Sequence, residues 1–238
     1  MEAYLSLLES LDAQIQNGAP LLKENDQIRV VITVQQQKIL YSSVYLQLYN
    51  LVESTVSNCI KSVTDALTAN DVRAKQLNES ILKEWVRSIG RTHIDLSYEN
   101  RLESLLIVSS HLLVDAPISK SDFVVEKGGG GNWDDVEIEN ICKRLGWTLK
   151  IDTTAYKSVK RKYRNDLGIL GYLKSLRNDL AHGSISFEEC GEGETVSNLR
   201  ELAKNVFSYL LELVKFFEKK VSSQDFLLPE HRPAHSVR

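Results

Sequence analysis

Three residues near the end of a leucine-rich segment could carry out acid–base chemistry. Within "LKSLRNDLAHGSISF", residues 173–187, the side chains of Arg177, Asn178 and His182 come just before Gly183. A histidine has an ordinary pKa of about 6.5, so it can act as a base or an acid at neutral pH. An arginine keeps its charge, and its planar fork can bind two oxygens of a phosphate. The pattern therefore indicates proton transfer beside a stabilised anion.

A helix that ends at Gly183 must position these side chains. Its expected apolar stripe has steps of three and four residues: Ile169, Leu173, Leu176 and Leu180. Arg177 and His182, five apart, do not converge on an ideal helix, whereas Asn178 and His182 share one face. A helix end at Gly183 would leave His182 free to turn. The alternative is that the helix dipole alone favours a histidine there.

The same region is basic in an acidic chain. Residues 157–182 hold seven Lys or Arg against two Asp, which makes a net charge of +5; the whole chain has −3, so the remainder carries −8. Such a concentration can steer a polyanion toward one face of a protein. The alternative is an ordinary solvated helix surface.

Helical periodicity dominates the rest of the chain. Helices are expected over about 2–17, 27–69, 76–90, 98–115 and 133–145, followed by two apolar-striped helices in the C-terminal third that pack as antiparallel partners. The long second helix carries Tyr49 and Glu53, four apart, at the edge of its apolar arc.

Length and composition predict one domain. With 238 residues, of which 42% are hydrophobic, the chain can bury a substantial core. We expect one helical domain over 1–222, a less regular insertion at about 116–155 and a loose tail at 223–238. Within the insertion, "DFVVEK" (122–127) resembles a short strand and the glycines at 128–131 a loop. The glycines are no phosphate loop, because no GK[ST] follows them and Asp134 and Asp135 would repel phosphate.

Several protein classes are disfavoured. No run of about 18 apolar residues is present, so no membrane span is expected, and the first residues are acidic, so no export signal is expected. We therefore expect a cytoplasmic protein. The three cysteines are far apart, odd in number and without CxxC spacing, so we expect reduced structural thiols, no disulfide and no metal site. No cofactor is expected either.

Two stretches resemble a known family. "RNDLAHG" (177–183) resembles the R-x4-6-H motif of the HEPN superfamily of ribonucleases and toxins, and "LYNLVEST" (48–55) resembles a Tyr/Glu-bearing early helix of its toxin-like branches. The resemblance implies an all-α HEPN-like helical bundle with long antiparallel helices. His182 is followed by Gly183 and Ser184 rather than by x-Tyr, so the chain does not match the form regulated by modification of that tyrosine.

The resemblance also implies an activity: a metal-independent endoribonuclease that cleaves RNA through attack of the 2'-OH, acting as a toxin or an anti-phage defence effector. His182 would be the acid or base, Arg177 the cation that stabilises the phosphorane, and Asn178 a group that orients the histidine or contacts RNA. Because one chain supplies a single such histidine, the resemblance implies a homodimer with a composite active site.

The remaining residues would support RNA binding. The candidates for phosphate contacts are Lys160, Arg161, Lys162, Arg164 and Lys174, while Tyr163 could stack on a base. Tyr49 and Glu53 would lie next to the catalytic residues Arg177 and His182 and support them without reacting themselves. An antitoxin or defence-system protein is an expected partner. The rival hypotheses are a non-catalytic HEPN-like binding or dimerisation module and an unrelated helical scaffold.

Overall fold

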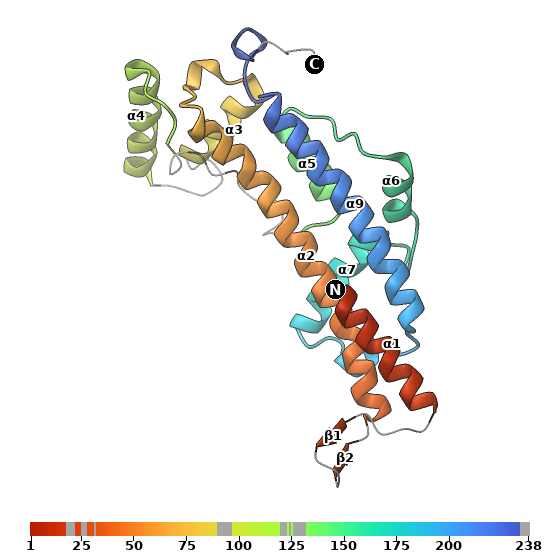
Figure 1. Cartoon of the computed structure of the whole chain (residues 1–238). Helices are drawn as coiled ribbons and strands as arrows, with labels where there is room; N and C mark the ends of the chain where they lie inside the picture. Colours follow the sequence, from red (N-terminus) through yellow and green to blue (C-terminus); the bar gives the residue numbers. More distant parts are fainter. Residues whose placement is uncertain are drawn as a thin grey trace. The chain divides into compact units, whose positions relative to one another are not determined.

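The computed structural model describes residues 1–17, 22–24, 28–30, 32–89, 97–119, 123, 125 and 132–233, and it is all-α apart from one small hairpin (Figure 1). The elements of these residues are α1 (Glu2–Gln16), β1 (Leu22–Glu24), β2 (Ile28–Val30), α2 (Val34–Ala69), η1 (Ala74–Gln76), α3 (Glu79–Ile89), α4 (Tyr98–Val114), α5 (Asp135–Arg144), α6 (Thr153–Lys160), α7 (Ile169–Ala181), α8 (Phe187–Cys190), α9 (Val196–Ser222) and η3 (Pro229–His231).

The start of α2 differs from the expected helix at about residue 27. Residues 28–30 pair as an antiparallel strand with 22–24, Leu22 opposite Val30. The helix begins at Val34 because the side chains of Thr33 and Gln36 each accept a hydrogen bond from the other residue's backbone N–H, at 3.2 and 2.9 Å. This capping box sets a helix start that apolar periodicity alone does not locate.

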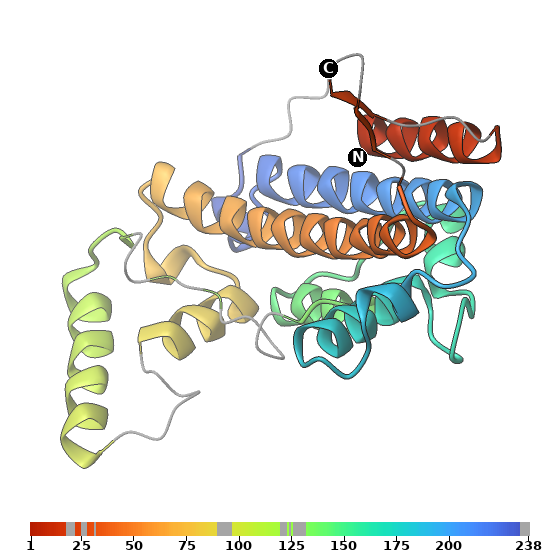
Figure 2. The ribbon, with the colours of Figure 1, turned by 90° about the horizontal axis from the view of Figure 1, so that it is seen from below.

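The chain divides into two compact units, and both long helices contribute to each of them. The first unit contains residues 1–52 and 153–210, and the second contains 53–152 and 211–238. In Figure 2 the two long helices, α2 and α9, can be followed by their colours along most of their length. Their apolar residues therefore supply part of the core of both units.

The first unit is held by the apolar stripes that the sequence predicts. Its buried residues come from α1, α2, α7 and α9 and include Leu5, Leu8, Val44, Leu48, Leu173, Leu199 and Val206. Two tyrosines, one on each helix, hold α1 against α2: Tyr4 of α1 donates to the carbonyl of Leu40 at 2.9 Å, and Tyr41 of α2 donates to Asp12 at 2.6 Å. The connection after α7 contains α8, whose N-cap Ser186 forms a capping box with Glu189.

Within the expected insertion, α5 forms the helix that the sequence predicts over about 133–145. It is N-capped: Asp134 accepts from the N–H of Glu137 at 2.9 Å. Gly146 has a φ of +80° just after the helix, the conformation that favours glycine. The glycines at 128–131 and most of the expected strand at 122–127 lie outside the described residues.

The expectation of a loose tail is wrong for residues 223–233. Phe226 and Leu227 are buried, and the carbonyl of Phe226 accepts from the N–H of Asn78 at 3.0 Å. Arg232 pairs with Asp225, which also pairs with Lys220 of α9. Two apolar residues and a small ion-pair network thus fasten a segment that lacks helical periodicity. Residues 234–238 lie outside the described residues.

Within the part of the chain that the structure describes, no helix combines the length and apolar character needed to cross a bilayer.

Candidate functional site

The end of α7 has the geometry that the sequence predicts. The helix ends at Ala181, His182 is its C-cap, and Gly183 has a φ of +70°. The N–H of Ser184 donates to the carbonyl of Asp179 at 2.8 Å, which satisfies one of the last helical carbonyls. The His182 side chain is exposed at this end. The helix therefore presents an imidazole to solvent from a well-defined backbone position.

Arg177 is held from two sides. One of its terminal nitrogens donates to Asn178 Oδ1 at 3.0 Å, and its guanidinium carbon lies 5.5 Å from the centre of the Tyr49 ring. Tyr49 is buried in α2, so the ring is a fixed surface, and an arginine over an aromatic face is favoured electrostatically. Arg177 is itself half-buried, which limits the orientations of its fork.

Asn178 acts on its two neighbours in different ways. Its side chain accepts from Arg177, whereas its backbone carbonyl accepts from the N–H of His182 at 2.9 Å. Asn178 was expected to orient the histidine or to contact RNA; in the structure its side-chain oxygen orients the arginine, and no hydrogen bond joins its side chain to the imidazole. Glu53, the other residue expected to give support, lies one turn after Tyr49 on α2, where the second unit begins.

Part of the basic segment surrounds a hollow of about 430 Å³ in the first unit. Its lining includes Arg161, Lys162, Tyr163 and Arg164 on one side and Asn198, Glu201 and Asn205 of α9 on the other. Lys162 makes an exposed ion pair with Asp166 at 2.8 Å. Arg161 is exposed and has no partner among the described residues. The other two expected cations lie on helices: the ammonium of Lys160 lies 5.4 Å from the Tyr156 ring centre, and Lys174 is half-buried on α7.

Arg164 has a structural partner that the sequence did not indicate. It pairs with Glu194, whose side chain is 0% exposed, and it donates to the Tyr172 hydroxyl at 3.5 Å. Arg164 is therefore committed to an internal ion pair, and is a poorer candidate for a phosphate contact than Arg161. Glu194 lies 30 residues further along the chain, in a Gly- and Glu-rich connection with no periodicity that could have revealed it.

Three tyrosines enclose this ion pair. Burial is the main cause that raises the pKa of Tyr45, Tyr163 and Tyr172, and the negative charge of Glu194 raises each of them further. The Tyr163 ring packs edge-on against Tyr172, with ring centres 5.4 Å apart. Tyr163 is half-buried in this packing, so it is not the free platform for a base that the sequence suggested.

No group of three His, Cys, Asp or Glu side chains in the described ranges is arranged to hold a metal ion. All three cysteines are free and buried. Burial raises the pKa of the Cys59 and Cys142 thiols to about 12 and that of Cys190 to about 11, as expected for structural thiols.

The fold and the site together define a class: a helical domain that presents an arginine and a histidine, four residues between them, at a helix end. Over residues 3–226 the chain matches the family model of HEPN_MAE_28990-like HEPN domains. The chain belongs to the HEPN superfamily. Neither the curated proteins nor the solved structures compared with it gave a match.

Proposed function

We propose that this HEPN domain is a metal-independent endoribonuclease. One observation carries the proposal: α7 presents an exposed His182 at its C-terminal end, while Arg177 of the same helix is oriented by Asn178 and the Tyr49 ring. A base, a fixed cation and an acid are the groups that cleavage of RNA by its own 2'-OH requires. HEPN domains are often ribonucleases, which supports this reading.

The proposed reaction proceeds in one displacement. A base removes the proton of a ribose 2'-OH, the oxygen forms a bond to the adjacent phosphorus, and the bond from phosphorus to the 5'-oxygen breaks. An acid protonates the departing 5'-oxygen. The products are a 2',3'-cyclic phosphate and a 5'-hydroxyl. Arg177 stabilises the negative charge that gathers on the phosphoryl oxygens.

The reaction uses two proton-transfer groups, but each chain has one His182. We infer a two-fold homodimer in which two α7 ends face one groove, so that one histidine acts as base and the other as acid. The protein is then expected to sediment as a dimer. Mixing His182→Ala chains with Arg177→Ala chains should not restore full activity, because every composite groove would still lack a group. A fully active monomer would contradict this arrangement.

The decisive experiment incubates the purified protein with mixed cellular RNA in EDTA. Cleavage should persist and leave a cyclic phosphate, and DNA should stay intact because it lacks the nucleophile. His182→Ala should reduce the rate at least about 10²–10⁴-fold, and Arg177→Lys should be strongly impaired because a point charge does not reproduce the fork. His231→Ala is the matched control, since His231 is also exposed. Products with a 5'-phosphate, or a His182→Ala protein as active as wild type, would refute the proposal.

RNA binding has its own test. Replacing Lys160, Arg161 and Lys162 together by alanine should weaken RNA affinity, most visibly at low salt, because fewer counterions are released on binding. The matched control replaces three exposed lysines outside this segment: Lys61, Lys143 and Lys204. Equal affinity and equal salt dependence in the two triple variants would show that the segment is only a solvated surface.

The physiological role that we propose is that of a toxin or anti-phage defence effector, held in check by an antitoxin or defence-system partner. A wild-type protein that binds RNA or a partner and never cleaves would instead favour a non-catalytic HEPN binding module.

A further inference from the structure

The hollow of about 430 Å³ beside the basic segment contains hydrogen-bonding groups that the fold leaves unused. Arg161, Asn198, Glu201 and Asn205 all line it, and the side chains of these four residues have no partner among the described residues. All four belong to the first unit, which also contains α7. Polar side chains that line one hollow without bonding to one another are available to a ligand.

Three of these groups share one face of α9. Asn198, Glu201 and Asn205 follow one another at steps of three and four residues, so their side chains project to the same side of the helix. Glu201 is exposed, and its carboxylate offers two acceptor oxygens that no cation neutralises among the residues that the structure describes. The two amides, one turn to either side of it, can each donate and accept. On the other side of the hollow, Arg161 supplies a planar set of donors.

The same hollow has an apolar wall. Ile169, the first residue of α7, and Leu202 of α9 both line it, and they are only 2% and 1% exposed. Ligand sites typically combine an apolar lining with a few polar groups that fix the orientation of the ligand, and they have volumes in this range. An apolar wall with free donors and acceptors at its edge suits the ring of a nucleobase.

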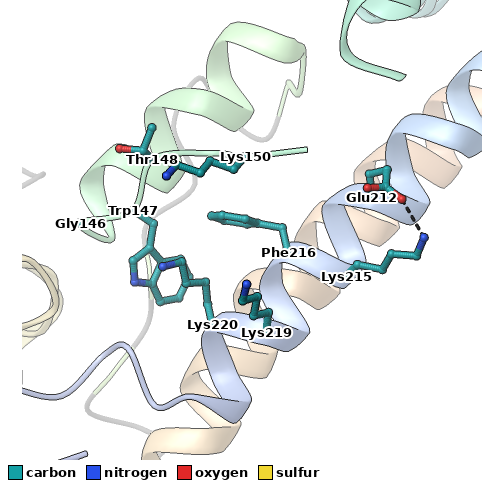
Figure 3. A pocket seen from close by; sticks show the side chains of 9 residues that line it. All are labelled: Gly146, Trp147, Thr148, Lys150, Glu212, Lys215, Phe216, Lys219 and Lys220. Carbon is teal, nitrogen blue, oxygen red and sulfur yellow. Dashed lines mark hydrogen bonds and ion pairs between the residues drawn. The ribbon is translucent and has the colours of Figure 1, made fainter. Parts of the chain in front are cut away.

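A second hollow, of about 490 Å³, lacks this combination of free groups (Figure 3). It belongs to the second unit, where Lys150, after α5, and Lys219 of α9 both line it. The one carboxylate in its described lining, that of Glu212, is already paired with Lys215 at 2.7 Å. Lysine side chains donate but do not accept. This hollow therefore offers no free carboxylate to the N–H groups of a base, whereas the hollow beside the basic segment does.

We propose that the hollow beside the basic segment binds an unpaired guanine of the RNA, an inference that rests on the proposed ribonuclease function. Glu201 accepts from the adjacent N1–H and N2–H groups of the base, and Arg161 donates to its O6 and N7. Adenine and cytosine place a ring acceptor next to a single amino group, and that acceptor would face the carboxylate. Guanine offers two donors side by side to a carboxylate and two acceptors to a guanidinium, so it matches both free charges.

The recognised base lies away from the bond that is cleaved. Ile169 lines the hollow at the start of α7, and His182 follows the end of the same helix. The 13 residues of α7, at about 1.5 Å each, separate the two places by roughly 20 Å. A strand that spans this distance places the guanine several nucleotides from the scissile phosphate. The guanine thus selects the RNA segment that is cut, and the cut sites should share a guanine at a fixed spacing.

The test measures the affinity of full-length His182→Ala protein for short single-stranded RNAs, in EDTA, by fluorescence anisotropy. The strands are uridine oligomers that differ in one central base, which is guanine, hypoxanthine, adenine or cytosine. The guanine strand should bind at least about fivefold more tightly than the adenine and cytosine strands, the lower end of what a bidentate base contact contributes. Hypoxanthine lacks the amino group that donates the second hydrogen bond to Glu201, so its strand should bind with intermediate affinity.

Two further variants, made in the His182→Ala protein, isolate the carboxylate. Glu201→Ala should bind the guanine and adenine strands equally, with little change in its affinity for the adenine strand. The matched control is Glu103→Ala, which removes an exposed carboxylate outside the hollow and should keep the preference for guanine. A thermal melt of each variant identifies unfolded protein. Equal affinity of the His182→Ala protein for all four strands, or a guanine preference that survives in Glu201→Ala, would overturn the inference.

Failure of this inference and failure of the ribonuclease proposal give different results. A wild-type protein that cleaves RNA, while the His182→Ala protein binds all four strands equally, would refute the guanine site alone. A preference for the guanine strand in a protein that never cleaves would refute the ribonuclease alone. Sequencing the ends of RNA cut by the wild type gives a second measurement: guanine should occur at one fixed distance from the cut, and Glu201→Ala should lose this enrichment.

Discussion

The ion pair between Arg164 and Glu194 is expected to stabilise the first unit, so replacing Arg164 by methionine should destabilise the protein. Methionine keeps much of the aliphatic volume but removes the cation. The Glu194 side chain is 0% exposed, so its carboxylate would remain buried without a counter-charge. Losing one partner of a fully buried pair costs about 3–5 kcal/mol. Because Arg164 is 37% exposed, water already screens the pair, so we expect Arg164→Met to lower the free energy of unfolding by about 2–4 kcal/mol.

Two comparison variants isolate the cause. In Glu194→Gln the remaining charge is that of Arg164, which reaches solvent, so the free energy of unfolding should fall by only about 1 kcal/mol. The double variant Arg164→Met/Glu194→Gln should be more stable than Arg164→Met alone, because no buried charge is left over. The assay is urea unfolding followed by circular dichroism, with thermal melts expected to shift by roughly 5–15 °C for Arg164→Met.

Two results would refute this reasoning. One is an Arg164→Met protein as stable as wild type; the other is a double variant whose free energy of unfolding falls by the sum of the decreases in the two single variants. The RNA affinity of the same variants shows whether Arg164 has a structural role or an RNA-binding role. If the role is structural, the double variant should keep wild-type RNA affinity, whereas Arg161→Ala should weaken it.

Two further predictions concern the glycines and the cysteines. Gly191→Ala should destabilise the protein by more than about 3 kcal/mol, because a Cβ at this position would lie 2.0 Å from the Lys38 carbonyl oxygen and create a buried clash. Gly171→Ala on α7 should instead stabilise the protein by about 0.5–1 kcal/mol, because a Cβ there has only ordinary contacts at 3.7 Å. Urea unfolding measures both changes. At pH 8 the three cysteines should react with iodoacetamide far more slowly in the native than in the unfolded protein, because burial hides the thiols and raises their pKa to about 11–12. Mass spectrometry measures the labelling, and three rapidly labelled thiols in native protein would contradict this prediction.

Local features of the chain could be predicted because each depends on residues close together in sequence. The end of α7 follows from Gly183, which accepts the positive φ that stops a helix, and this alone places His182 in an exposed cap. The N-cap of α5 at Asp134 and the buried stripe of α7 are of the same kind. The R-x4-H spacing, another local signal, pointed to the HEPN superfamily.

Features that depend on the path of the chain were decided by the tertiary structure. Glu194 reaches Arg164, Tyr49 lies under Arg177, and Lys150 and Lys219 line one hollow from separate elements. Periodicity reports which face of one helix is apolar, but it carries no information on which distant residue the folded chain brings to that face. The packing of 223–233 was missed for the same reason: Phe226 and Leu227 are buried beside residues 77–78, and Asp225 pairs with Lys220 of α9 as well as with Arg232 of its own segment.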